Sequence, residues 1–296
     1  MRYQDITGSF LWSATFLSIL TVAVSASYQH NQYDPSGKSI MKAWHCHGRS
    51  QKDLVDRLRQ AKIVKSPAVQ RVMELVDRKY YVGEHLDQST NPYMDSPMGI
   101  GKSQTISAPH MHAHVLEEIL PVICRNAGTE ERPAKLLDVG CGSGYLTACL
   151  GRWFHVGSRD DEASNILPFQ GKVFGMDIHP ELVEFTRLNI QKNDCDLLES
   201  NTIKLKHGNG WLGWPEEAPF DAIHVGAAAA TFPMQLALQL VLHGILVVPV
   251  GHQGGNQILL KVERVAQSSV DRFSWEDYHV TQLLGVRYVP LVQRPE

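Results

Sequence analysis

The strongest constraint on the fold comes from the second half of the sequence, where short apolar runs alternate with segments of helical spacing. The runs predict β-strands, and the segments after Gly144, after Pro180 and around 233–242 predict helices. Such alternation is typical of a doubly wound, mostly parallel α/β sheet, which binds ligands at the carboxyl ends of its strands. The runs predicted to be parallel strands are KLLDV (135–139), KVFGMD (172–177), TIKLKH (202–207), FDAIHV (220–225) and GILVVPV (244–250).

Two further apolar runs close the sequence. They cover 257–263 and 283–291 and have no clear helix between them, so the sheet is expected to end in an antiparallel pair. The polar stretch 157–170 separates a predicted helix from a predicted strand. We expect it to be a solvated surface insertion.

The region before the sheet predicts a helical subdomain. Ser50 begins a capping-box-like sequence, and Ser66-Pro67 has the pattern of an N-cap followed by proline in the first turn. With 296 residues, 43 % of them hydrophobic, the chain can bury a large core. We expect one domain over 41–296, with a helical part at 50–114 that covers the site and the sheet at 135–296.

The first 40 residues are expected to lie outside this domain. No Asp, Glu, Lys or Arg occurs between Asp5 and Asp34, and residues 10–26 are nearly all apolar or small. Such a stretch fits a cleaved signal peptide, and its roughly 18 residues also suffice for a membrane anchor. The remaining interpretation is an upstream start codon on a cytosolic protein, with Met41 as the alternative start.

Charge and cysteine content exclude several classes of protein. The formal net charge is −3 and there is no long basic run, so the chain lacks the phosphate-neutralising patch of a nucleic-acid binder. The five cysteines are odd in number and include no CxxC pair. This argues against a disulfide framework or a zinc knuckle and favours reduced thiols.

A glycine-rich loop, LLDVGCGSG at 136–144, is the sharpest local signal. Gly140, Gly142 and Gly144 allow the backbone to turn closely around a ligand before a helix begins near Tyr145. The spacing is G-x-G-x-G, whereas the dinucleotide fingerprint needs G-x-G-x-x-G. The carboxylate of Asp138 also suits a cationic ligand, so the loop favours S-adenosylmethionine over NAD.

Two further positions follow predicted strands and are candidates for the same cofactor. Asp177 ends the run 172–177, where a carboxylate can accept hydrogen bonds from both ribose hydroxyls. Asn209-Gly210 follows the run 202–207, at the level expected for the adenine. An amide there can accept from the adenine amino group, although Asn before Gly is also ordinary turn chemistry.

Histidines alternate in the stretch QTISAPHMHAH (104–114) and raise the possibility of a metal site. On a helix, His110, His112 and His114 do not share one face, because successive members are about 200° apart. No carboxylate or cysteine follows at zinc spacing. We therefore expect no metal, and interpret His45-Cys46-His47 as part of a linker.

Several segments from about Met41 to the end resemble protein-L-isoaspartate (D-aspartate) O-methyltransferases in order and spacing. The most specific are TISAPHMH and the HVGAAA within EEAPFDAIHVGAAA. The segments are NPYMDSP (91–97), TISAPHMH (105–112), LLDVGCGSGYLTA (136–148), EEAPFDAIHVGAAA (216–229), LVVPVG (246–251), GGNQ (254–257) and GVRYVPL (285–291).

The resemblance implies roles for individual residues. The Ser of TIS is the active-site residue of the family, which is Ser107 here, and Ser143 and Asp177 bind the cofactor. Relatives carry an acidic residue in a G-D-G element where this chain has Asn209, which puts cofactor affinity in question rather than the chemistry. Some relatives continue beyond VPL with a cofactor-contacting tail that this chain does not match. The residues implied to line the cofactor after Ser107 are Ala108, Pro109, His110, Met111 and His112.

The resemblance also implies a fold and a reaction. The fold is the Rossmann-like class I methyltransferase fold, and the reaction is S-adenosylmethionine-dependent methylation of the free carboxyl of L-isoaspartyl residues in damaged proteins. The resulting ester collapses to a succinimide and so begins repair. The expected partners are isoaspartyl-containing peptides and proteins, without nucleic acid or a stable protein partner, and the expected state is a cytoplasmic monomer.

The chemistry of this reaction explains why a neutral hydroxyl suffices. A free α-carboxyl group has a pKa of about 3.5, so it is ionised at pH 7 and needs no strong general base. In-line displacement at a sulfonium requires mainly positioning. Ser107 can donate to the carboxylate without a salt bridge that would quench its nucleophilicity.

Alternative interpretations remain for function and for two segments. The chain could be a methyltransferase for another acceptor or a non-catalytic adaptor, and the glycine spacing disfavours a dehydrogenase. The stretch VGAAAA (225–230) either packs a helix tightly on the sheet or lies against a bound peptide. Val286 to Val289 could pair with the peptide backbone, a mode that tolerates varied sequences.

Overall fold

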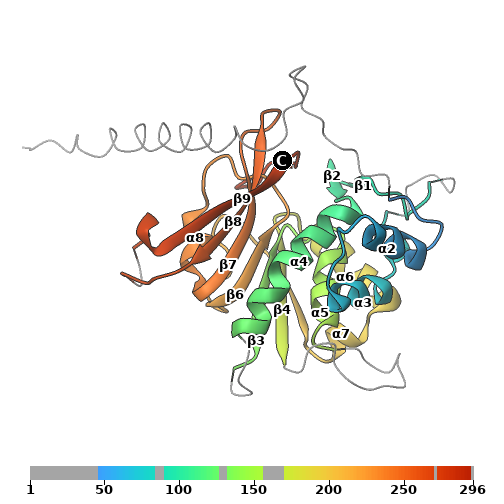
Figure 1. Ribbon diagram of the computed structural model, residues 1–296, viewed down its shortest axis with the longest axis horizontal. Helices are drawn as coiled ribbons and strands as arrows, with labels where there is room; N and C mark the ends of the chain where they lie inside the picture. Colours follow the sequence, from blue (N-terminus) through green and yellow to red (C-terminus); the bar gives the residue numbers. More distant parts are fainter. Residues whose placement is uncertain (1–45, 84–89, 127–131, 156–169, 270–271, 295–296) are drawn as a thin grey trace, which may run out of the picture. The chain divides into compact units, whose positions relative to one another are not determined.

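The computed structural model describes residues 46–83, 90–126, 132–155, 170–269 and 272–294 (Figure 1). The apolar extension at 1–40 lies outside the described residues, as does the predicted insertion except for Gln170. Within the described part of the chain, no helix is long and apolar enough to cross a bilayer.

A seven-stranded sheet forms the centre of the described domain, in the order β5-β4-β3-β6-β7-β8-β9. β3 to β7 pair in parallel, and β8 and β9 are antiparallel to their neighbours. The predicted doubly wound sheet with an antiparallel closing pair is confirmed. The strands are β3 (Ala134–Val139), β4 (Gly171–Asp177), β5 (Ile203–His207), β6 (Phe220–Val225), β7 (Leu240–Val250), β8 (Gln257–Arg264) and β9 (Tyr278–Val286).

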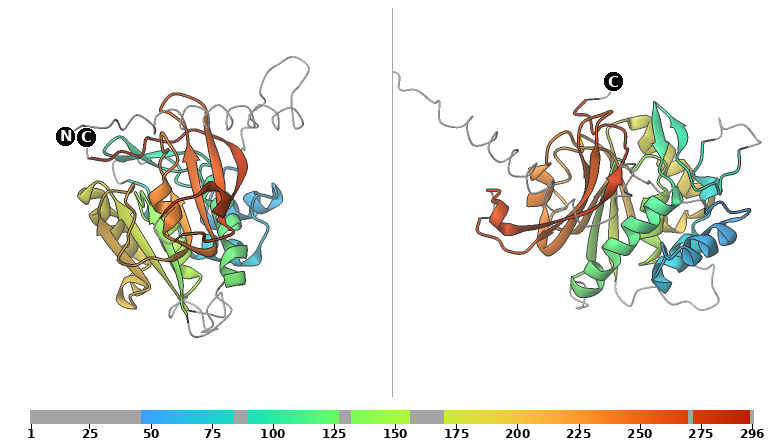
Figure 2. Two further views of the ribbon diagram at one scale, coloured as in Figure 1. Left: turned by 90° about the vertical axis from the view of Figure 1, so that its left-hand side faces the viewer. Right: turned by 45° about the horizontal axis from the view of Figure 1, so that its top comes forward.

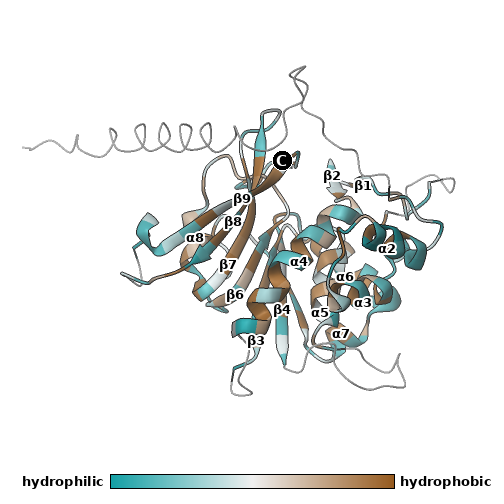
Figure 3. Cartoon of the chain, viewed as in Figure 1, coloured by the Kyte–Doolittle hydropathy of each residue, from teal (hydrophilic) through white to brown (hydrophobic). Residues whose placement is uncertain are grey.

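Apolar residues occupy both faces of the central strands, because a parallel sheet is covered on both sides. Leu136 packs in one core and its neighbour Leu137 in the other, as the two-residue period of a strand requires. The strands are hydrophobic along most of their length, whereas α2 is largely hydrophilic (Figure 3). This explains why the strands read as continuous apolar runs in the sequence.

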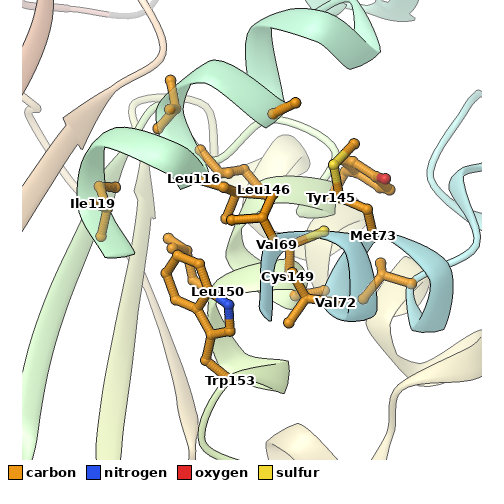
Figure 4. Packing of buried hydrophobic residues seen from close by; sticks show 14 of the residues in the cluster. Val69, Val72, Met73, Leu116, Ile119, Tyr145, Leu146, Cys149, Leu150 and Trp153 are labelled. Atoms are coloured by element: carbon orange, nitrogen blue, oxygen red, sulfur yellow. The ribbon is translucent and has the colours of Figure 1, made fainter. Parts of the chain in front are cut away.

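Helices cover the two faces unequally. The right-hand view of Figure 2 shows α4 running across the strands, where it contacts β6 and β7. Leu150 of α5 and Trp153, which caps α5, pack with Val72 of α3 and Leu116 of α4 in the core beneath α4 (Figure 4). α8 supplies Leu236 to the opposite core. The helices are α2 (Gln51–Gln60), α3 (Pro67–Leu75), α4 (Pro109–Asn126), α5 (Tyr145–Arg152), α6 (Pro180–Asn193), α7 (Asp196–Glu199) and α8 (Met234–Leu238), with short 3-10 turns at Arg78–Tyr80 and Trp275–Asp277.

The two N-terminal helices begin where the sequence predicts. The Ser50 hydroxyl accepts the amide N–H of Asp53 at 3.2 Å, as in a capping box. Ser66 behaves differently, since its hydroxyl donates to the carboxylate of Glu117 at 2.6 Å and makes no cap hydrogen bond. The second N-cap is therefore tied to α4.

A β-hairpin lies within the part 50–114 that was predicted to be helical. β1 (Met98–Gly101) and β2 (Gln104–Ile106) pair antiparallel. Lys102 and Ser103 have φ angles of +51° and +55°, which is the backbone of a type I′ turn. This hairpin has little signal in the sequence, because both strands are short and two of the four residues of β1 are glycine.

Two element boundaries were wrong. The helix predicted around 233–242 ends at Leu238, and β7 begins at Leu240, where it pairs with Phe220 of β6. The strand predicted at 283–291 begins earlier, at Tyr278, and ends at Val286. We call the following residues, Arg287–Val292, the C-terminal strap.

Candidate active site

The candidate site lies at the carboxyl ends of β3 and β6, where the strand order reverses. β4 and β5 lie on one side of β3, whereas β6 and β7 lie on the other. In open α/β sheets such a crevice binds ligands. Two adjoining cavities occur there, a larger one of about 550 Å³ and a smaller one of about 340 Å³, both partly open to solvent. Thr105, Gly140, Gly142 and Gly226 line both.

Glycines bring backbone, rather than side chains, to the boundary between the cavities. Gly140 and Gly142 have φ angles of +76° and +55°, in the left-handed region that favours glycine. The Gly140 N–H donates to the Met176 carbonyl at 2.8 Å, which folds the loop over the end of β4. A Cβ at Gly226 would lie 2.8 Å from the Gly140 carbonyl oxygen, so β6 and the loop can approach this closely only with glycine.

Asp177 ends β4 and lines the larger cavity. Its carboxylate oxygens accept the backbone N–H groups of Gly142 at 3.1 Å and His179 at 3.0 Å. Burial raises the pKa of Asp177 above its usual value, against the opposing effect of these two hydrogen bonds. Each oxygen retains a lone pair, so the carboxylate can also accept from a diol.

Asp138 lines the smaller cavity as part of a buried polar pair. One oxygen lies 2.8 Å from Nδ1 of His224, and the other accepts the Thr147 hydroxyl at 2.6 Å. His224 lines the same cavity. The sequence analysis did not select His224, although it lies inside the HVGAAA segment on which the family resemblance rests.

Ser107 also lines the smaller cavity, between the end of β2 and the start of α4. The hairpin and the helix therefore hold it from both sides. The structure brings Ser107 to the same cavity as five other predicted positions. These are His112, Asp138, Gly140, Gly142 and Ser143.

His112 is the one residue of the stretch 108–112 that reaches either cavity. Its ring lies 5.0 Å from the Tyr145 ring, and its buried Nδ1 has no hydrogen-bond partner among the described residues. Burial lowers the pKa of His112 well below its usual value, with the nearby charge of Arg78 as the next cause. The imidazole is therefore neutral.

The other four residues of that stretch lie elsewhere. Ala108 and Met111 pack in the core, and Pro109 begins α4. His110 is tied to Asp95, whose Oδ1 lies 2.8 Å from the imidazole Nδ1 and accepts the His110 amide N–H at 2.9 Å. They support the Ser107 turn without lining the cavities.

The predicted adenine residues divide in the same way. Gly210 lines the larger cavity, but Asn209 does not. The Asn209 side-chain oxygen accepts the Trp211 N–H at 3.0 Å, which is an Asx-turn. The sequence left open whether Asn209 contacts the adenine or forms a turn, and these contacts show the turn. Gly144, the last glycine of the loop, caps α5 with a φ angle of +85° and lines neither cavity.

Among the described residues, no three or more His, Cys, Asp and Glu side chains form a group that could hold a metal ion. His110 contacts Asp95, and His112 faces the smaller cavity.

The C-terminal strap covers the larger cavity, a feature that the sequence analysis missed. Val289, Pro290, Leu291 and Val292 all line that cavity. The strap is joined to the VGAAAA segment by two backbone hydrogen bonds, from Ala228 N–H to the Val289 carbonyl at 2.7 Å and from Leu291 N–H to the Ala228 carbonyl at 2.8 Å. The small residues after β6 thus allow the strap to approach.

A family model for protein-L-isoaspartate (D-aspartate) O-methyltransferases matches residues 49–296. The chain belongs to this family. A Triticum aestivum protein-L-isoaspartate O-methyltransferase is 38 % identical over 242 residues, covering 81 % of this chain and 90 % of the relative. A Caenorhabditis elegans protein-L-isoaspartate O-methyltransferase is 34 % identical over 254 residues, covering 86 % and 97 %.

Solved structures of this methyltransferase family share the fold. A Plasmodium falciparum protein described as a protein-L-isoaspartate O-methyltransferase was crystallised with S-adenosyl-L-homocysteine. It superposes with a TM-score of 0.64 at 30 % identity, covering 83 % of this chain and 99 % of that one. A second protein-L-isoaspartate O-methyltransferase structure gives a TM-score of 0.61 at 18 % identity and supports the fold alone.

The methyltransferase uses S-adenosylmethionine, and the residues around the two cavities fit that cofactor. The glycine loop presents backbone at positive φ angles to both cavities, and Asp177 places a carboxylate at the end of the neighbouring strand. The buried Asp138 adds negative charge beside the smaller cavity. This arrangement complements a ligand that carries a ribose diol and two cationic groups.

Proposed function

We propose that this protein transfers a methyl group from S-adenosylmethionine to the free α-carboxyl group of L-isoaspartyl residues in damaged proteins. The observation that carries the proposal is the position of Ser107 in a cavity that adjoins the one beside Asp177, with the glycine loop lining both. The methyl group of the cofactor and the substrate carboxylate that accepts it can therefore meet at the boundary between the two cavities. Collapse of the ester to a succinimide then begins repair.

The adenosyl part of the cofactor is assigned to the larger cavity. Asp177 and Gly210 line this cavity, where Asp177 would accept hydrogen bonds from the ribose hydroxyls and Gly210 would border the adenine. The cofactor's ammonium and sulfonium groups are assigned to the smaller cavity, near Asp138 and Ser143. When bound, the cofactor supplies an electrophilic methyl group.

The side chains around the reacting carboxylate hold and orient it. The substrate carboxylate is ionised near neutral pH, so no residue needs to remove a proton. Ser107 donates a hydrogen bond, and the neutral His112 adds no positive charge that would pair with the nucleophile. Positioning of this kind contributes up to about 7 to 11 kcal/mol in well-oriented cases.

The substrate backbone is assigned to the free edge of β9, the last strand of the sheet. Val286 pairs with Gln257 of β8, and the Tyr288 backbone bonds to the Gln257 side chain. Because backbone groups alternate in direction along a strand, those of Arg287 face the free edge. Pairing through the backbone tolerates varied substrate sequences.

Methyl transfer to defined peptides tests the proposed function. Matched peptides that contain isoaspartate or normal aspartate are incubated with labelled S-adenosylmethionine and the full chain, or its Ser107→Ala variant. We expect base-labile label on the isoaspartyl peptide alone and a lower rate for the variant. A D-aspartyl peptide gives the range of substrates, and size-exclusion chromatography tests the proposed monomer.

The negative outcomes of this experiment are informative. Cofactor binding without transfer to either peptide would contradict the repair function and favour an adaptor or another acceptor. Equal transfer by wild type and Ser107→Ala would remove Ser107 from the reaction. Tryptophan fluorescence of the variant confirms that it is folded.

A further inference from the structure

His224 and Asp138 form a hydrogen-bonded pair on neighbouring strands. They are direct partners in the register of β3 and β6, and Nδ1 of His224 lies 2.8 Å from Oδ1 of Asp138. Both residues line the smaller cavity. The pair therefore borders the space to which the ammonium and sulfonium groups of the cofactor are assigned.

Asp138 itself offers a ligand little access. Its Oδ1 accepts from His224 and its Oδ2 accepts the hydroxyl of Thr147 at 2.6 Å, so both carboxylate oxygens already have a protein partner. Asp138 is 1 % exposed, whereas His224 is 6 % exposed. The imidazole is consequently the more accessible polar group of the pair.

The hydrogen bond with Asp138 determines where the imidazole carries its proton. An ionised carboxylate only accepts, so Nδ1 of His224 is protonated, and the neutral ring then has its lone pair on Nε2. Nε2 has no hydrogen-bond partner within the part of the chain that the structure describes. His224 thus keeps an acceptor for a ligand.

The imidazole lies next to the boundary between the two cavities. A Cβ added at Gly226, which lines both cavities, would lie 3.5 Å from Cε1 of His224. Cε1 is bonded to both ring nitrogens, so Nε2 is close to this contact. The acceptor therefore lies near the point where the adenosyl part of the cofactor continues into its methionine part.

We propose that Nε2 of His224 accepts a hydrogen bond from the ammonium group of S-adenosylmethionine. An ammonium group only donates, so its neighbours must accept. A protonated imidazole would have no lone pair and would repel the ammonium, so the ligand binds the neutral ring. Asp138 acts through the imidazole, because hydrogen bonds in series polarise one another and its negative charge strengthens Nε2 as an acceptor. This inference rests on the placement of the cofactor in the proposed function.

The test compares two ligands by isothermal titration calorimetry with the full chain. One is S-adenosylhomocysteine, and the other is its deamino analogue, which lacks only the ammonium group. Wild type should bind the deamino analogue about tenfold more weakly, as for loss of one hydrogen bond to a charged group. Equal affinity of wild type for the two ligands would overturn the inference without any variant.

The variant His224→Asn separates the acceptor from the pairing with Asp138. Its amide N–H can still donate to Asp138 from the position of Nδ1, but no acceptor remains at the position of Nε2. We expect the Kd for S-adenosylhomocysteine to rise about tenfold and the Kd for the deamino analogue to stay within about twofold. An unchanged Kd for S-adenosylhomocysteine, or an equal rise for both ligands, would overturn the inference.

His110→Asn is the matched control. His110 is also paired with an aspartate through Nδ1 at 2.8 Å, but it lines neither cavity. This variant should not discriminate between the two ligands, and a selective loss of S-adenosylhomocysteine equal to that of His224→Asn would contradict the local role of His224. Guanidinium titration confirms that both variants are folded.

The outcomes distinguish this inference from the proposed function. If wild type shows the expected difference between the two ligands but does not methylate the isoaspartyl peptide, the proposed function fails and the role of His224 stands. If wild type methylates the peptide and His224→Asn binds S-adenosylhomocysteine normally, the proposed function stands and the inference fails.

Discussion

Gln257 offers the sharpest test of how the C-terminal strap is held. In Gln257→Leu, both hydrogen bonds to the Tyr288 backbone are lost while the side-chain volume is roughly kept. A backbone group left without a partner in a closed structure costs about 1 to 3 kcal/mol. The strap can open locally and so avoid part of the cost of the two lost hydrogen bonds. We therefore expect the closed strap to be destabilised relative to the open one by about 1 to 3 kcal/mol.

This destabilisation should appear mainly in cofactor affinity. The strap lines the larger cavity, so a cofactor that binds the closed form loses about 5- to 150-fold in affinity. The Kd for S-adenosylhomocysteine is measured by isothermal titration calorimetry, and the free energy of unfolding by guanidinium titration without ligand. Gln282→Leu, at an exposed position on β9, is the control. A lower free energy of unfolding with an unchanged Kd would refute the reasoning.

Two further predictions concern the peptide and the pH dependence of stability. Arg287→Pro removes the backbone N–H assigned to the peptide, so it should raise the peptide KM about tenfold. Arg287→Ala keeps this N–H and should leave the KM unchanged. Normal peptide affinity of the Pro variant would count against pairing of the peptide with the edge of β9. Folded His112 stays neutral while the unfolded chain takes up a proton below its ordinary pKa of 6.5. Its contribution to stability is therefore complete well above pH 6.5 and declines as the pH falls below that value, by roughly 1 kcal/mol at pH 5.5. His112→Gln should lack this decline in guanidinium titrations at pH 7 and 5.5, and an identical pH dependence would contradict the assignment.

The sequence predicts the parallel strands well because burial on both faces makes them continuous apolar runs. The run predicted at 220–225 coincides with β6, and the end of β4 at Asp177 is correct to the residue. The hairpin of β1 and β2 has no such signal, since its exposed positions include Gly99 and Gly101. Its turn depends on left-handed backbone at two non-glycine residues, which local propensity does not predict.

The sequence predicts site residues that directly follow a strand. It predicts less well those whose position depends on tertiary contacts. Gly140, Gly142 and Asp177 were identified because the carboxyl ends of neighbouring strands meet. The Asn209 side chain could contact the adenine or form a turn, and in the structure its oxygen accepts the Trp211 N–H and forms a turn. Val289 of the strap lies 149 positions from Gly140 in the sequence, so only the folded chain brings both residues to the larger cavity.

The C-terminal strap borders both proposed ligands, and this imposes an order on product release. Its later residues line the cofactor cavity, while Arg287 is assigned to the peptide. A peptide paired along β9, as proposed, would hold the strap in place, so we expect the spent cofactor to leave only after the methylated protein has dissociated. A second damaged protein that docked before the exchange would then trap S-adenosylhomocysteine inside. Turnover should consequently slow at high concentrations of protein substrate, and added S-adenosylmethionine should not fully restore it.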